Sequence, residues 1–227
     1  MEKRVYKLFK EGKLLVRAVY PLCYEYYNNE KHYDCTVWID EFELLTKSLL
    51  GSASTTLIYP NVGIHLYHSI GFLMDADLTY CHHISKIDSS SRGNILEGDF
   101  DAAPPSFDTI EELSRYIKET KSTEMNEVNV VASIDSVVGL VGPKECIKET
   151  LIVKACLKKR FGIDLPLYCY CATKGTLEKI ELTKEKISEL ISELKTPKIY
   201  YWTGEEDIKE NSIDIRDIIT EKTIRNR

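Results

Sequence analysis

The stretch EVNVVASIDSVVGLVGPKECIKETLIVKACLKKRFG, residues 127–162, contains two strand patterns followed by one long helical pattern. Residues 127–132 and 136–141 are short runs rich in valine, a β-branched residue that favours strands. Pro143 and Gly162 bracket the helical part, because proline is favoured at the start of a helix and glycine just past its end. The stretch therefore predicts two strands followed by a helix.

Beyond residue 162, strand and helix patterns continue to alternate. A helix is expected over 183–195, where Ile187, Leu190, Ile191 and Leu194 recur at helical spacing. The strands expected around this helix lie near residues 166–172, 177–182 and 198–202. The remaining residues, 206–227, are rich in charge and are expected to form a C-terminal tail after a single domain over residues 1–205.

The N-terminal part of the chain predicts mainly strands. The apolar residues alternate on both sides of Glu11-Gly12, and glycine suits the turn of a β-hairpin. The expected elements are a hairpin with strands near 5–9 and 14–20, a strand over 32–39, a helix over 40–50 with Asp40 as its N-cap, and a strand over 52–59.

A polar loop and a well-signalled helix connect these two parts. Residues 85–108 are rich in serine, glycine and acids and predict a long surface loop. Thr109 and Glu112 then form a capping box that starts a helix ending near Thr120. Strands that cluster first and alternate with helices later predict an α+β fold, with one mixed or mostly antiparallel sheet and about four helices.

Composition narrows the function classes. Of the 227 residues, 43% are hydrophobic and 29% are charged, which is typical of a folded globular protein. The net charge of −6 opposes binding to a nucleic-acid backbone. No apolar run is long enough for a membrane span, and the charged N-terminus lacks a signal-peptide core. We therefore expect a cytoplasmic protein that binds no nucleic acid.

The seven cysteines are expected to be reduced thiols. Their number is odd, and no two of them form a Cys-x-x-Cys pair. Cys169 and Cys171 would point to one face of a strand, yet a zinc site needs a second pair of ligands. The sequence therefore predicts neither a disulfide framework nor a bound metal.

One ordered trio suggests nucleotide chemistry. Arg17 lies in an expected strand, Ser54-Thr55-Thr56 begins another, and Glu127 begins a third. This order resembles the arginine, serine–threonine and glutamate pattern of ADP-ribosyltransferases. The resemblance implies NAD as the cofactor, held by Arg17, Ser54 and Thr55, with Glu127 as the catalytic carboxylate that transfers ADP-ribose to an acceptor. Met125 stands where arginine-modifying members carry a second acid, which leaves the acceptor open.

A histidine-rich segment offers a second hypothesis. His65, Cys81, His82 and Asp88 could act as the base, nucleophile and orienting acid of a cysteine hydrolase, because an imidazole can activate a thiol. The same segment, which also contains His68 and His83, could instead serve a metal-dependent hydrolase. In both cases residues 60–105 are expected to form the mouth of a cleft.

The third hypothesis is a protein-interaction module without catalytic activity. Tyrosines gather at residues 24–27 and 200–201, and tyrosine is enriched at protein interfaces. Together with the acidic loop near residues 95–106, they predict a protein partner. The overall composition also resembles secreted effector proteins of intracellular bacteria, which would place the protein in a host cytosol.

Overall fold

Two mixed β-sheets form the frame of the protein in the computed structural model, which describes residues 2–19, 22–27, 29–48, 50–66, 70–88, 106–195, 198–202 and 212–218. In the larger, eight-stranded sheet only β8 and β9 run parallel to each other. In spatial order its strands are β10 (Thr176–Lys179), β9 (Leu167–Cys171), β8 (Val137–Gly142), β5 (Ile70–Asp75), β1 (Leu14–Val19), β4 (Leu50–Ile58), β7 (Glu127–Ala132) and β6 (Tyr80–Ser85).

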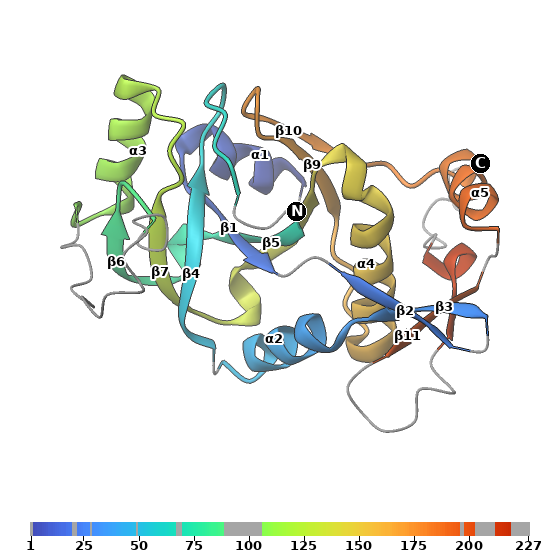
Figure 1. Ribbon diagram of the computed structural model, residues 1–227. Coiled ribbons are helices and arrows are strands. Elements are labelled where there is room, and N and C mark those ends of the chain that lie inside the picture. Colours follow the sequence, from blue (N-terminus) through green and yellow to red (C-terminus); the bar gives the residue numbers. More distant parts are fainter. Residues whose placement is uncertain are drawn as a thin grey trace, which may run out of the picture.

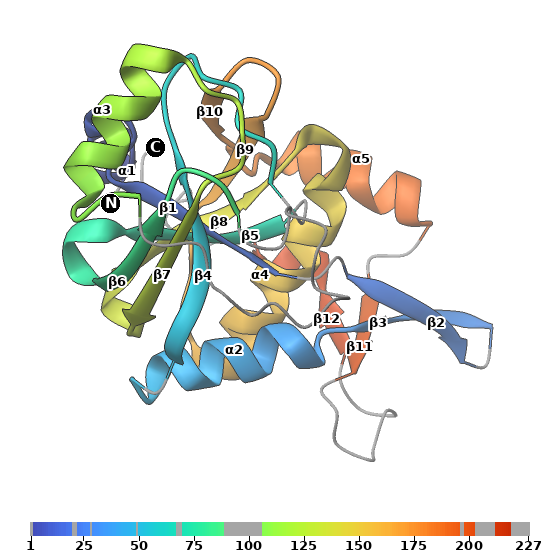
Figure 2. The ribbon, with the colours of Figure 1, turned by 60° about the vertical axis from the view of Figure 1, so that its left-hand side comes forward.

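The smaller sheet is built from both ends of the chain. Its four strands are β12 (Ser212–Asp214), β11 (Lys198–Trp202), β3 (Glu30–Asp34) and β2 (Cys23–Tyr27), in that spatial order. The β2–β3 hairpin is antiparallel, whereas β3 and β11 run parallel. Figure 2 shows this hairpin projecting from the body of the molecule, with β2 as its outermost strand.

Helices cover both faces of the larger sheet (Figure 1). Helix α1 (Glu2–Glu11) packs on one face, where alternate strand residues such as Leu14 and Tyr168 meet its apolar side. Helices α2 (Thr36–Thr46) and α4 (Ile147–Phe161) contribute to the larger core cluster. The strand residues of this cluster, such as Leu15 and Leu167, are the direct neighbours of Leu14 and Tyr168 and point to the opposite face of the sheet. The strand alternation therefore divides the core into two apolar layers.

The N-terminal hairpin predicted from the sequence is wrong in its first strand. Residues 2–11 form α1, and Val5, Leu8 and Phe9 are buried at helical spacing. Gly12 ends the helix with φ +68°, and a Cβ at this position would meet the Ser114 hydroxyl oxygen at 2.0 Å. The short apolar run fits either periodicity, and packing on the sheet selects the helix.

The boundary between the third strand and the following helix also differs from the prediction. Residues 32–39 were expected to be extended, but β3 ends at Asp34 and α2 begins at Thr36 instead of after Asp40. Trp38, Ile39 and Phe42 are buried on one side of this helix. Tertiary burial of this side overrides the strand propensity of the β-branched residues Thr36 and Val37.

The later elements confirm the sequence prediction. Helix α3 (Ile110–Thr120) begins at Thr109, whose hydroxyl accepts the Glu112 N–H at 3.2 Å, and α5 (Lys184–Leu194) follows its N-cap Thr183. Strands β7 and β8 lie where they were expected, and Gly162 ends α4 in the left-handed conformation. Between Pro143 and α4, residues 144–146 form a 3-10 turn.

The α+β fold class is confirmed, but the described residues form two mixed sheets instead of one and five α-helices instead of about four. Most of the predicted loop, residues 89–105, lies outside the described residues, as do 206–211 and 219–227 of the expected tail. Within that tail, β12 pairs with β11 and buries Ile213, so this part belongs to the fold. No helix within the described ranges is long and apolar enough to cross a membrane.

Candidate functional site

Arg17 and Ser54, the first two members of the trio, lie in contact. The Arg17 guanidinium donates from Nη1 to the backbone carbonyl of Ser54 at 3.0 Å. Its Nη2 and Nε donate to the two carboxylate oxygens of Glu41, on α2, at 2.6 and 3.2 Å. This fork geometry holds Arg17 between strand β4 and helix α2.

Glu127, the third member, projects from the opposite face of the sheet. Thr55 on β4 is paired with Val128 on β7, and strand alternation places Arg17 on the same face as this pair. Glu127 precedes Val128 and therefore points the other way, where it faces the buried Ser85 on β6. The Thr55 hydroxyl is also engaged, because it donates to the Val128 carbonyl at 2.7 Å.

The structure thus brings the Arg17 side chain to the Ser54 backbone, whereas the side chains of Ser54 and Glu127 lie on the opposite face of the sheet from Arg17. Arg17 contacts a protein carboxylate at the position where the resemblance expects a cofactor phosphate. Nothing in the geometry tests NAD binding or ADP-ribosyl transfer directly. Both stay predictions.

The histidine-rich segment is spread over distant parts of the sheet. Cys81 lies on β6, at one edge of the larger sheet, and its thiol contacts the Thr79 hydroxyl at 3.5 Å. Burial raises the pKa of the Cys81 thiol, which opposes formation of the nucleophilic thiolate. His82 follows it on an exposed position of the same strand.

His65 lies near the other edge of this sheet. The preceding residue, Ile64, donates its N–H to the Tyr170 hydroxyl on β9 at 3.1 Å, and β9 is separated from β6 in the strand order by β8, β5, β1, β4 and β7. Asp88 is buried near the start of β7, where its N–H donates to the Met125 carbonyl at 2.8 Å. His68 lies outside the described residues. The structure therefore does not assemble His65 with Cys81, and the hydrolase remains a prediction without a described constellation.

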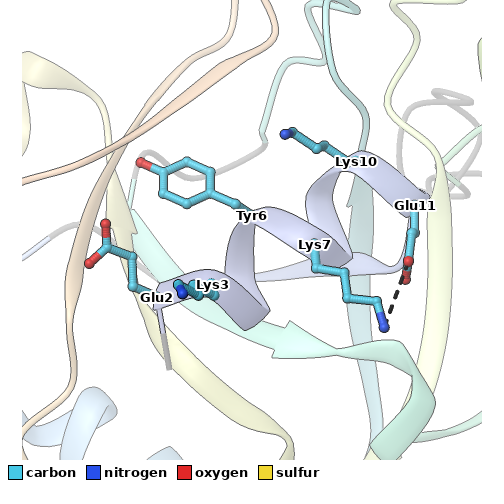
Figure 3. Close-up of a pocket in the computed structure, with 6 residues that line it drawn as sticks. All are labelled: Glu2, Lys3, Tyr6, Lys7, Lys10 and Glu11. Atoms are coloured by element: carbon cyan, nitrogen blue, oxygen red, sulfur yellow. Dashed lines mark ion pairs between the residues drawn. The ribbon is translucent and has the colours of Figure 1, made fainter.

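Two hollows on the described surface are lined by residues other than the predicted ones. One groove of about 460 Å³ runs along the exposed face of α1, and Figure 3 shows its lining residues with the Lys7–Glu11 ion pair. All of its lining residues come from this one helix, and they mix lysines with glutamates. A second hollow, of about 520 Å³, lies beside α3. Neither hollow is lined by a residue of the trio or of the histidine-rich segment.

The smaller sheet carries a row of aromatic side chains that runs from the core to the surface. Tyr201 on β11 pairs with Tyr33 on β3, and Tyr33 pairs with Tyr24 on β2, so the three side chains share one face. Their exposed fractions are 2%, 5% and 50% in this order, and Tyr26 on the same face of β2 is 70% exposed. We call Tyr24, Tyr26 and Tyr33 the hairpin patch.

Ring contacts order the hairpin patch. Tyr24 contacts Tyr26 edge-on with ring centroids 6.0 Å apart, and it contacts Tyr33 at 6.1 Å. The Lys31 ammonium lies 3.4 Å from the Tyr24 ring centroid, which is favourable electrostatically. The patch therefore presents the exposed rings of Tyr24 and Tyr26 beside the buried ring of Tyr33, with the Lys31 ammonium against Tyr24.

The sequence indicates Tyr24 and Tyr26 as interface candidates, but it does not distinguish an interface from a core and does not single out Tyr33. Alternation in β2 predicts that Tyr24 and Tyr26 share a face, and it equally fits a strand packed in the interior. The deciding fact is that, among the strands that the structure describes, β2 is the last one of its sheet, and it projects beyond the helices in Figure 2.

No protein-family model matches the chain, and a search of the curated proteins finds no match. The case for a function therefore depends on the geometry of the chain itself.

Proposed function

We propose that this protein is a protein-interaction module that docks an extended segment of a partner protein on strand β2. The single observation that carries the proposal is the exposure of Tyr24 and Tyr26 on an edge strand, in a row whose inner members are buried. Exposed aromatic rings that adjoin one another, unlike singly exposed ones, are typical of protein interaction surfaces.

Both the backbone and the side chains of β2 support this proposal. An edge strand presents unpaired N–H and carbonyl groups to which a partner strand can add. The rings of Tyr24 and Tyr26 offer apolar area at a low entropy cost, and their hydroxyl groups can hydrogen-bond at the rim. The Lys31 ammonium above Tyr24 favours a partner segment that carries an acidic side chain.

Serine substitutions test the hairpin patch. Tyr24→Ser and Tyr26→Ser together should reduce capture of partner proteins by the tagged protein at least about tenfold, because interface tyrosines contribute roughly 1–2 kcal/mol or more each. The measurement is quantitative mass spectrometry of proteins cross-linked to the wild type and to the variant in the cells that produce it.

Tyr80→Ser is the matched control. Tyr80 is also 70% exposed and also lies on an edge strand, β6, but it belongs to the other sheet. Its substitution should leave the captured proteins unchanged. Equal capture by the double variant and the wild type would contradict docking on β2, and equal loss in both variants would indicate a nonspecific effect of exposed tyrosines.

A further inference from the structure

A pair of thiols on β9 belongs to the larger sheet, whereas the hairpin patch belongs to the smaller one. Cys169 and Cys171 are two positions apart on this strand and therefore point to one face, while Tyr168 and Tyr170 between and before them point into the core on the other face. Both cysteines are partly exposed free thiols. We call them the β9 dithiol.

The surroundings leave room at this face. The β8 residue paired with Cys169 is Gly142, which has no side chain, and the β10 residue paired with it is the exposed Glu178. Because β10 is the edge strand, the dithiol lies one strand from solvent.

Polar groups near the turn after β9 favour the thiolate of Cys171. The Thr173 hydroxyl lies 3.2 Å from the Cys171 Sγ. This hydrogen bond, followed by that of the Lys174 backbone N–H, lowers the pKa of the Cys171 thiol. Burial raises the pKa of Cys169, with Glu178 and Cys171 adding to the effect, so the two thiols differ in character.

We propose that Cys169 and Cys171 form a two-coordinate binding site for copper(I). Thiolates are soft ligands that select soft metal ions, and copper(I) is satisfied by two of them in a linear arrangement. A structural zinc ion needs four ligands, and within the described ranges no group of three or more histidine, cysteine, aspartate or glutamate side chains is arranged to hold a metal.

The binding step is balanced without any redox change. The two thiols release two protons to solvent as two sulfur–copper bonds form, and copper stays in the +1 state. The product carries one net negative charge. Lys174 favours negative charge at Cys171, whereas at Cys169 the nearby Glu178 and Glu145 oppose negative charge more than Lys144 favours it.

Copper(I) titration under anaerobic, reducing conditions tests this site. With a chromogenic copper(I) chelator as competitor, the wild-type protein should retain one equivalent that both Cys169→Ser and Cys171→Ser lose. Cys23→Ser, which removes an exposed thiol on β2, should retain it. Retention of the equivalent by both folded β9 variants would overturn the proposal, as would its loss from the Cys23 variant alone.

A direct measurement on the wild-type protein keeps the test decisive if the serine variants do not fold. X-ray absorption of the wild-type complex should find two sulfur neighbours, and three or more would overturn two-coordinate binding.

Discussion

At the residue scale, two neighbouring tyrosines on β9 differ in what their hydroxyl groups contact. Tyr170 accepts the Ile64 N–H at 3.1 Å, which ties the segment after β4 to β9. The Tyr168 hydroxyl is buried and has no hydrogen-bond partner among the residues that the structure describes. The Tyr168 ring meets Tyr6 of α1 edge-on, with ring centroids 6.2 Å apart. The contribution of the Tyr168 ring to stability can therefore be measured separately from that of its hydroxyl group.

Phenylalanine substitutions should separate these two roles. Tyr170→Phe should lower the free energy of unfolding by about 1–3 kcal/mol, because it leaves the Ile64 N–H unpaired. Tyr168→Phe should leave it unchanged or raise it by about 1 kcal/mol, because it removes a buried polar group without a partner. Urea unfolding of both variants provides the measurement, and an equal loss in both would refute the difference.

At the element scale, helix α3 depends on groups that lie outside its own hydrogen-bond pattern. The Thr109 hydroxyl accepts the Glu112 N–H, and the Glu112 carboxylate accepts the Asp108 N–H at 2.9 Å. The helix buries Leu113 and Ile117 in the larger core cluster. Its start is therefore fixed locally and its position is fixed by packing.

Loss of this cap should destabilise the protein by a measurable amount. Thr109→Ala should lower the free energy of unfolding by about 1 kcal/mol, because one N–H of the first turn loses its acceptor. Thr109→Ser keeps the oxygen and should stay close to the wild type. Thermal and urea unfolding compare the three proteins, and a serine variant as weak as the alanine variant would show that the methyl group matters instead.

At the scale of the whole molecule, the burial of tyrosine hydroxyl groups makes the stability of the fold depend on pH in the alkaline range. Burial raises the pKa of Tyr168, Tyr170 and Tyr201 to about 12 each. In the unfolded chain these groups ionise near pH 10. The folded state therefore holds protons that the unfolded state releases, and its advantage is complete below about pH 10 and is lost as the pH rises toward 12.

The protein should accordingly unfold in strong alkali with a tyrosine signal. Ionisation of each of the three tyrosines should lower the free energy of unfolding by on the order of 2 kcal/mol between about pH 10 and pH 12. One titration should record tyrosinate absorbance, which reports ionisation, and circular dichroism, which reports unfolding. The ionisation of these three tyrosines should coincide with the loss of the circular dichroism signal. Full ionisation of the tyrosines near pH 10 with an intact fold would contradict the buried environment.

The sequence by itself determined the elements whose signals are local. The capping box at Thr109 starts α3, Thr183 starts α5, and Gly162 ends α4, because caps and left-handed glycines act within one turn of the chain. The valine-rich runs of β7 and β8 also sufficed for two strands.

Only the tertiary structure decided whether an ambiguous segment forms a helix or a strand, and which side chains lie on the same face of a sheet. Residues 2–11 became a helix because Val5, Leu8 and Phe9 pack on the larger sheet. Arg17 and Glu127 lie on opposite faces because the pairing of β1, β4 and β7 fixes their register, and register depends on residues far apart in the chain. The exposure of Tyr24 and Tyr26 follows in the same way from the place of β2 at the end of its sheet.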